Sequence, residues 1–268
     1  GADAGGAGGG DGRPRGGGGP GGGRGTVSGR ASLCGAALLE VGRRIEGLLR
    51  DLARAGVGDG APTLLDVGCW DGGFTSRCAA ALGAGRVLGV EVYEEPAAAA
   101  EARGIEVARV DLEGGRLPWP DASIDVVVCN QVLEHLKNVW LPMTEMHRVL
   151  RPGGRAVLSV PNLSSLHNRV LLALGRQPTS IRAFGPHVRG FAFREFCAFV
   201  ERGGAYEIER RIGAGFHPLR PPLTRPPAAL WPGAAHTTIV LARKSGAPAP
   251  WLEYIESEVE GGMQTFYA

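Results

Sequence analysis

The sequence has few aromatic residues, few sulfur-containing residues and little net charge, and each shortage narrows what the protein can be. Aromatic residues make up 6% of the chain, and its five cysteines follow no C-x-x-C or Cys/His spacing. The sequence therefore indicates neither a disulfide framework nor a zinc site. A net charge of +2 argues against a nucleic-acid-binding protein that works by neutralising phosphates. No apolar run reaches the about 18 residues that a membrane span needs. We expect a cytoplasmic protein in a reducing compartment, with an organelle as the alternative.

The two ends of the chain differ in composition from its middle. Residues 1–30 are mostly glycine and almost free of apolar side chains, so folding them would not offset the lost conformational entropy. We predict a disordered leader there, and it lacks the apolar core of a secretory signal. Residues 246–268 carry four glutamates and no lysine or arginine. We therefore expect one domain over 31–245, followed by an acidic tail over 246–268.

Apolar spacing predicts an alternation of helices and strands. Apolar residues recur at steps of three and four from Ser32 to Ala55, which is typical of an amphipathic helix. Short apolar runs follow at 63–67, 86–91, 105–110, 124–129 and 155–160. Their alternation with longer mixed segments indicates βαβ units and a parallel sheet. We expect further helices over 131–150 and 193–201, paired strands over 206–212 and 236–243, and a surface loop over 213–235.

The segment LLDVGCWDGGFT, residues 64–75, is the most informative in the chain. An apolar strand ends in Asp66 and then breaks into glycines, as in a tight turn that faces a ligand. Gly68 and Gly72 have no Cβ, so their backbone can come close to a bound molecule. The turn lacks the G-x-G-x-x-G spacing of dinucleotide-binding dehydrogenases.

Polar residues also follow the next three predicted strands. Glu91 ends the second strand, Asp111 follows the third, and Asn130 and Gln131 follow the fourth. Ligands bind at the carboxyl ends of the strands in open α/β sheets. Each residue has a simpler alternative: a solvent-facing carboxylate at Glu91, a turn at Asp111, or helix capping at Asn130. Their order after four successive strands favours a binding site.

These segments resemble the class I S-adenosylmethionine-dependent methyltransferases, in particular their small-molecule "type 11" branch. Two further segments share the resemblance, LPWPDASIDVVVCNQVLEHL and HRVLRPGGRAVLSVPN. The resemblance covers about residues 64–162. It implies an α/β, Rossmann-like sheet of seven strands, mostly parallel with the last antiparallel, with helices on both faces. It implies S-adenosylmethionine as cofactor, bound by Asp66, Gly68, Cys69, Trp70, Gly72, Glu91, Val92, Asp111, Leu112, Asn130 and Gln131.

The resemblance also suggests roles for individual residues. Glu91 would accept the ribose hydroxyls, Asp111 would contact the adenine amino group beside Leu112, and Asn130 would border the methionine moiety. Trp70 stands where the family usually has a glycine. Since φ > 0 is unfavourable for a bulky residue, we expect a negative φ at Trp70, with the turn built around the neighbouring glycines. Its indole either lines the pocket or packs against helices.

His135 is the candidate catalytic base, because it follows the fourth strand near the expected position of the methyl group; the alternative is a structural histidine on a helix face. The segment QVLEH, residues 131–135, also resembles the Glu-x-x-Glu-His metal motif of ubiquinone-pathway O-methyltransferases. Gln131 replaces the first glutamate, and an amide lacks the charge that a hard cation favours. We therefore predict no metal site. His147 is expected to be structural.

The insertion over 161–190 is expected to cap the pocket and select the acceptor. It holds four arginines and no acid, which favours an anionic small molecule or a glycan- or lipid-linked acceptor, although the arginines could equally be solvated surface charge. Residues 168–175 are apolar with basic flanks, compatible with a lid helix or with peripheral contact to a membrane. We predict methyl transfer, with oxygen the favoured acceptor atom. The alternative is a catalytically silent methyltransferase-like module that binds a partner.

Overall fold

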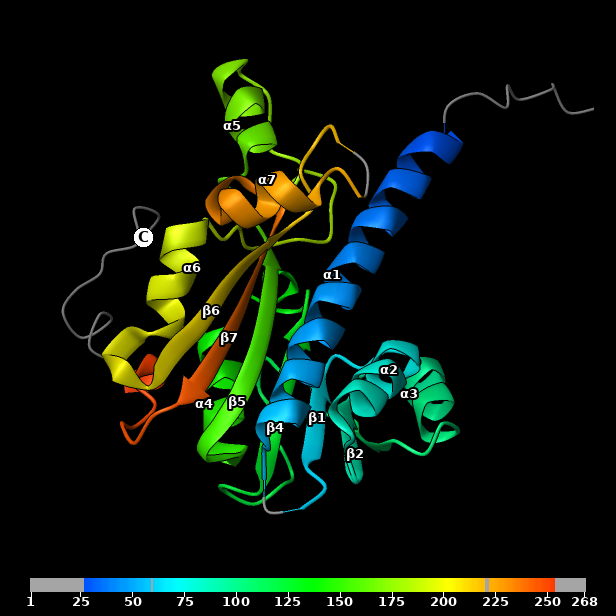
Figure 1. Ribbon diagram of the computed structural model, residues 1–268, viewed down its shortest axis with the longest axis vertical. Helices are drawn as coiled ribbons and strands as arrows, with labels where there is room; N and C mark the ends of the chain where they lie inside the picture. The colour runs from blue at the N-terminus through cyan, green and yellow to red at the C-terminus, as the bar shows by residue number, and fades with distance from the viewer. Residues whose placement is uncertain (1–26, 59, 220–221, 254–268) are drawn as a thin grey trace, which may run out of the picture.

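The computed structural model describes residues 27–58, 60–219 and 222–253, with the side chains of the first helix from Leu38 onward (Figure 1). Its helices are α1 Val27–Ala55, α2 Gly73–Leu82, α3 Glu94–Glu101, α4 Trp140–Val149, α5 Leu166–Ala173, α6 Phe193–Val200 and α7 Arg225–Leu230. Its strands are β1 Thr63–Val67, β2 Arg86–Val90, β3 Glu106–Ala108, β4 Ile124–Asn130, β5 Leu150–Pro161, β6 Tyr206–Ala214 and β7 Thr237–Lys244. Three short 3₁₀ turns are η1 Leu133–His135, η2 Arg202–Gly204 and η3 Pro232–Ala234.

The strands form one sheet in the order β3-β2-β1-β4-β5-β7-β6. Strands β1 to β5 pair in parallel, whereas β7 runs antiparallel to both β5 and β6. The predicted α/β sheet of seven strands, with only the last strand reversed, is confirmed within the described residues. The β1 strand lies near the middle, where the direction of strand succession changes, and such a switch point is where ligands bind in these sheets.

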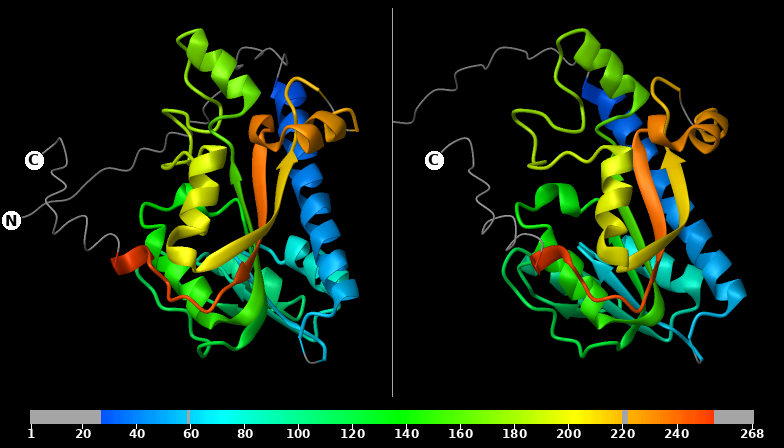
Figure 2. Two further views of the ribbon diagram at one scale, coloured as in Figure 1. Left: turned by 60° about the vertical axis from the view of Figure 1, so that its left-hand side comes forward. Right: turned by 90° about the vertical axis from the view of Figure 1, so that its left-hand side faces the viewer.

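Helices cover both faces of the sheet, which explains why its central strands are almost continuously apolar. Successive side chains of a strand point to opposite faces. On one face, Leu64 and Val126 pack with α1 and α2. On the other, Leu65 and Val127 pack with α4 and α6. Figure 2 shows the two layers, with α1 on one side of the sheet and α4 and α6 on the other.

The strand register brings the predicted site residues to one edge. Val67, at the end of β1, pairs with Val90 of β2 and with Cys129 of β4. The segments that follow these three strands therefore begin at the same level. Figure 1 shows α5 and α7 beyond this end of the sheet, towards which β5 points.

The predicted helix over 131–150 is wrong in its first half and at its end. Gln131 has φ 58°, and its amide donates to the Ser159 carbonyl at 3.0 Å, so the chain continues the β4–β5 pairing. A 3₁₀ turn follows, and α4 begins only at Trp140. Pro142 then lies in the first turn of α4, where no amide hydrogen is needed.

The residues that follow the predicted helix, 151–154, belong to a strand in the structure. The strand β5 starts at Leu150, and these residues form an irregularity in its pairing with β4: Ile124 pairs with Leu150, but Val126 pairs with Arg155. The Lys244 ammonium donates to the carbonyls of His147 and Leu150, each at 2.6 Å. These bonds satisfy carbonyls at the end of α4, so the helix can pass directly into a strand.

The segment 213–235 is not simply a loop, because it contains α7. The prolines of RPPAAL lie at the start of that helix, where proline is tolerated. Thr224, just before α7, donates its hydroxyl to Glu40 of α1 at 2.6 Å, and both side chains are buried. This contact fixes α7 against α1.

Residues 1–26 of the predicted leader and most of the acidic tail lie outside the described residues. The last four residues predicted as leader, 27–30, are not disordered, because α1 already begins at Val27. The division of the chain at residue 245 stays a prediction. The structure does describe Trp251, which is fully buried and donates its indole N–H to the Phe199 carbonyl at 2.8 Å. None of the helices that the structure describes has the length and apolarity needed to cross a membrane.

Candidate active site

The glycine turn after β1 is fastened to the end of β2 by backbone hydrogen bonds. The amides of Gly68 and Cys69 both donate to the Val90 carbonyl, at 2.9 and 3.0 Å. The Gly72 amide then donates to the Cys69 carbonyl at 2.9 Å, and α2 starts one residue later. The turn therefore positions the start of α2 at the carboxyl edge of the sheet.

The expectation of a negative φ at Trp70 is wrong: its φ is 47°. The Trp70 amide donates to a carboxylate oxygen of Glu91 at 3.1 Å, while the amide before it is held by β2. These bonds accompany the left-handed conformation, which costs about 1–2 kcal/mol in a residue with a Cβ. The indole is 59% exposed, so it is not packed into the helices. It meets Tyr93 edge-on, with ring centroids 6.2 Å apart, and both residues line a cavity of about 510 Å³ beside α3.

Glu91 is buried at the centre of this edge, only 7% exposed. One carboxylate oxygen accepts from Trp70, and the other accepts from the Tyr93 amide at 3.0 Å. Each oxygen has two lone pairs, so the carboxylate keeps the capacity to accept hydroxyl donors from a ligand. Val92, the next residue, is exposed.

Two glycines of the turn have no room for a side chain. A Cβ on Gly68 would lie 2.6 Å from a methyl group of Val132, and one on Gly72 would lie 2.5 Å from a methyl group of Ile105. Both have positive φ, 81° and 75°. Glycine is therefore required here by the backbone conformation and by packing within the protein, and the predicted close approach to a ligand stays a prediction.

Asp66 and Cys69 lie beneath the turn rather than on its surface. The Thr75 hydroxyl donates to Asp66 at 2.5 Å, and both side chains are buried. Burial raises the pKa of Asp66 to about 7, although the Thr75 hydrogen bond opposes the rise. The pKa of the buried Cys69 thiol is also raised, to about 12, chiefly by burial. These two side chains support the turn from below.

Asp111, after β3, hydrogen-bonds within its own turn, whereas Asn130 and Gln131, at the end of β4, hydrogen-bond to β5. Asp111 is exposed and accepts the Glu113 amide at 2.9 Å, which closes its own turn, while Leu112 packs against the main core. Asn130 accepts from the Ser159 hydroxyl at 2.6 Å, and the Gln131 amide group donates to that hydroxyl at 3.3 Å. Asn130 therefore pairs with β5, and it caps no helix.

The insertion after β5 reaches back to η1. The amides of Val188 and Arg189 donate to the Glu134 carbonyl at 2.9 and 3.2 Å. His135 is exposed, and its Nδ1 lies 3.3 Å from the Pro186 carbonyl. Its ring meets that of His187 edge-on at 4.7 Å. Burial, together with the nearby His187, lowers the pKa of His135.

Sequence reasoning missed Thr75 and Gly89, and it did not expect Glu134 to be buried or His187 to lie at this edge. A glycine inside a strand signals a close backbone approach, and Gly89 fits that signal, since a Cβ there would lie 2.6 Å from the Cys69 sulfur. Glu134 is 1% exposed, and burial raises its pKa to about 8. No spacing in the sequence links His187 to this edge.

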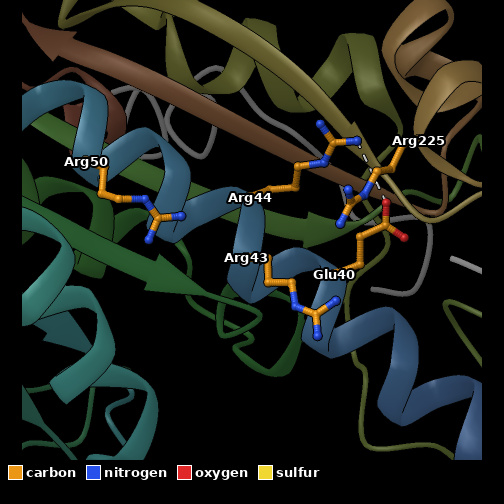
Figure 3. A pocket seen from close by; sticks show the side chains of 5 residues that line it. All are labelled: Glu40, Arg43, Arg44, Arg50 and Arg225. Atoms are coloured by element: carbon orange, nitrogen blue, oxygen red, sulfur yellow. Dashed lines mark ion pairs between the residues drawn. The ribbon is translucent and has the colours of Figure 1, made fainter. Parts of the chain in front are cut away.

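A second cavity, of about 340 Å³, lies along α1 (Figure 3). It is lined by four arginines and one acid: Glu40, Arg43, Arg44, Arg50 and Arg225. Arg44 pairs with Glu40 across 3.8 Å. None of the residues predicted to bind the cofactor lines this cavity, so the glycine turn and this basic hollow are separate features.

Comparison with known proteins gives a family match over residues 65–158, which match the methyltransferase domain. A Mycolicibacterium smegmatis protein named a probable S-adenosylmethionine-dependent methyltransferase is 37% identical over 157 residues, 58% of this chain and 55% of that protein. The 27-O-demethylrifamycin SV methyltransferase of Amycolatopsis mediterranei is 35% identical over 130 residues, 46% of each chain. The chain thus spans about half the length of these curated relatives.

Among solved structures, an S-adenosylmethionine-dependent methyltransferase from Mesorhizobium loti superposes with a TM-score of 0.50 at 23% identity, covering 72% of this chain and 96% of that one. At this identity the likeness speaks for the fold alone. The sequence match lies on the strands and turns from β1 to β5, which carry the residues described above.

Proposed function

We propose that this chain is a class I S-adenosylmethionine-dependent methyltransferase that transfers a methyl group to a small-molecule acceptor. The match of residues 65–158 to the methyltransferase domain and the likeness to relatives named as methyltransferases support this proposal. The observation that carries the proposal is the buried Glu91 carboxylate, held by two turn amides where β1 and β2 end. S-adenosylmethionine supplies an electrophilic methyl group on a sulfonium when bound. The chain's own work is therefore to bind, align and exclude water.

The residues at this edge fit a nucleoside cofactor. The free lone pairs of Glu91 suit a pair of hydroxyl donors. Gly68 and Gly72 have positive φ and pack against Val132 and Ile105, so the turn needs glycine at both positions to keep its backbone at this edge. Asp111 is exposed at the end of the neighbouring strand segment, where an amino group could reach it. Asn130, fixed by Ser159, would border the reacting end.

His135 is our candidate for receiving a proton from the acceptor. Its Nδ1 faces the Pro186 carbonyl, which favours the tautomer with a free Nε2. The lowered pKa keeps the ring neutral near pH 7, and only a neutral imidazole can accept a proton. The exposed position of the ring leaves it open to a bound acceptor.

We favour an oxygen atom on an anionic acceptor. The name of the Amycolatopsis relative specifies an oxygen as that protein's methylation site, which supports the same atom here. Two of the four insertion arginines are engaged: Arg169 donates to the Ser164 carbonyl, and Arg189 donates to the Lys137 carbonyl. Arg176 and Arg182 are exposed, and these two support an anionic group on the acceptor.

A lipid-linked acceptor is supported by apolar side chains on α5 and α7, beyond the carboxyl edge of the sheet. Leu172, Leu174, Leu230 and Trp231 are 51–87% exposed. Basic residues flank them on both helices, and such a combination suits an anionic membrane surface. Sedimentation with anionic vesicles tests this: we expect co-sedimentation that salt reverses, and a protein that stays in the supernatant would contradict it.

Calorimetric titration with S-adenosylmethionine tests the proposed function. We expect saturable binding to the wild-type chain and weakened binding to Glu91→Gln. The matched control is Glu106→Gln, which removes an exposed carboxylate paired with Arg86 and should bind as wild type does. No detectable binding at millimolar cofactor would refute the proposal. Binding without turnover across a broad panel of hydroxyl acceptors would instead support a catalytically silent module.

A further inference from the structure

Three potential metal ligands converge where the insertion meets η1. Glu134 and His135 belong to η1, and His187 comes from the segment after α5. Each offers one ligand atom, and these atoms all lie within 4.8 Å of one another. Glu134 is buried, His187 is half-buried and His135 is exposed, so the cluster has a closed side and an open side.

The Glu134 carboxylate lacks a partner in this position. Both of its oxygens are buried, and neither accepts a hydrogen bond from the part of the chain that the structure describes. A buried carboxylate without a partner is costly to keep ionised. A cation seated between Glu134 and the two imidazoles would provide the missing partner.

The two histidines are oriented as metal ligands usually are. The Nδ1 of His187 lies 2.8 Å from the Ser180 carbonyl, and that of His135 lies 3.3 Å from the Pro186 carbonyl. A carbonyl can only accept, so each Nδ1 carries the hydrogen and each Nε2 keeps its lone pair. A second hydrogen bond from the ring to a backbone carbonyl is the common support of a metal-ligating histidine.

The backbone also fastens the two halves of the cluster together. The residues directly after His187, Val188 and Arg189, donate their amides to the carbonyl of Glu134. Arg189 further donates to the Lys137 carbonyl at 2.7 Å, and its guanidinium lies 4.8 Å from the Trp140 ring centre. The loop that brings His187 is therefore tied to the residue that brings the carboxylate.

We propose that Glu134, His135 and His187 bind a zinc ion. Two imidazoles and one carboxylate form a set that suits Zn²⁺ better than Mg²⁺, and three protein ligands leave a fourth position for water or an acceptor oxygen. Bonds of about 2.0–2.2 Å require the ligand atoms to draw closer than 4.8 Å, and the exposed His135 ring can make that movement.

The site was not expected from the sequence, since Gln131 replaces the first glutamate of the metal motif. His187, brought in by the insertion, takes the place of that missing ligand. The inference goes beyond methyl transfer and does not depend on it. With the ion bound, His135 would ligate it and would no longer be free to receive a proton.

The test measures metal binding by the full chain after chelator treatment, without cofactor or acceptor. Zn²⁺ is titrated against a chromophoric chelator, and Co²⁺ is used as a spectroscopic probe. We expect one Zn²⁺ per chain and visible Co²⁺ bands typical of nitrogen and oxygen ligands. Glu134→Gln and His187→Gln should each weaken binding by about tenfold or more. His217→Gln is the matched control, because it removes an exposed imidazole stacked on His167 at 4.9 Å.

A thermal unfolding measurement guards against misfolded variants. Zn²⁺ should raise the Tm of the wild type and of His217→Gln, since it binds only the folded state, and at the same concentration it should raise the Tm of the two ligand variants clearly less. Absence of saturable binding, a Co²⁺ charge-transfer band from cysteine sulfur, or equal weakening by His217→Gln would each overturn the proposal. Because no cofactor takes part, these outcomes leave the proposed methyl transfer untouched.

Discussion

Replacing Trp70 by glycine and, separately, by alanine distinguishes the backbone strain at this position from the contribution of the indole. Its φ is 47°, a conformation that costs about 1–2 kcal/mol for any residue with a Cβ. Glycine relieves this strain but loses about 0.4–1 kcal/mol through the greater freedom of the unfolded chain. We expect Trp70→Gly to be more stable than Trp70→Ala by about 0.5–1 kcal/mol.

Both substitutions also remove the indole. It is 59% exposed and makes one edge-on contact with Tyr93, a kind of pair worth about 0.5–1.5 kcal/mol. Trp70→Ala should therefore lose about 1 kcal/mol relative to wild type, and Trp70→Gly should come close to wild type. Urea unfolding, with equal m-values, gives the comparison as a shift in midpoint.

Two further substitutions serve as controls for the argument. Ala122 also has a positive φ, 54°, so Ala122→Gly should raise the unfolding free energy. Ala183 is exposed and does not have a positive φ, so Ala183→Gly should lower it. If Trp70→Ala equals or exceeds Trp70→Gly in stability while the controls behave as stated, residue 70 is not strained and the reasoning fails.

Other substitutions at this edge have definite expected effects. Gly72→Ala adds a Cβ 2.5 Å from Ile105 at φ 75°, and thermal unfolding should show a loss of about 2 kcal/mol or more; an unchanged Tm would contradict it. In Glu91→Gln the side-chain NH₂ group would face one of the two backbone amides that now donate to Glu91, so two donors would oppose each other. Cofactor binding, measured by calorimetry, should weaken about tenfold or more, and unchanged affinity would contradict this prediction. Folded Asp66 keeps its proton up to pH about 7, whereas in the unfolded chain it loses the proton near pH 3.8. As the pH rises from about 3.8 to about 7, the unfolding free energy of the wild type should therefore fall by about 4 kcal/mol. Asp66→Asn should remove that fall in urea titrations at several pH values, and parallel pH profiles of the two proteins would refute the assignment.

The positions of the parallel strands could be predicted because burial on both faces leaves a clear pattern, whereas the reversal of the last strand was implied by the family resemblance. The run Ile124 to Cys129 is almost entirely apolar, and β4 lies where that run predicts. The shared level of the strand ends then follows from parallel pairing, which explains why Glu91 meets the turn after β1. These features depend on spacing along the chain, and spacing is what a sequence displays.

Local conformation was harder to predict where distant groups decide it. Steric preference predicts a negative φ for Trp70, but the Glu91 carboxylate and the Val90 carbonyl hold this turn. The same competition prevents the expected helix from starting at Gln131, whose amide pairs with Ser159 on β5. In both cases a hydrogen bond to another strand outweighs a local preference of about 1–2 kcal/mol.

The cluster of Glu134, His135 and His187 shows why side chains in an insertion escape sequence reasoning altogether. Nothing periodic relates residue 187 to residue 134. Their encounter is set by two backbone hydrogen bonds to the Glu134 carbonyl, and backbone donors carry no residue-specific signal. Residues 131–135 resemble a metal motif with one ligand missing, which led to the prediction of no metal site, and the third ligand of the proposed site comes only from the folded path of the insertion. The chemistry of this edge is therefore determined jointly by the βα segments that match the family and by a loop outside that match.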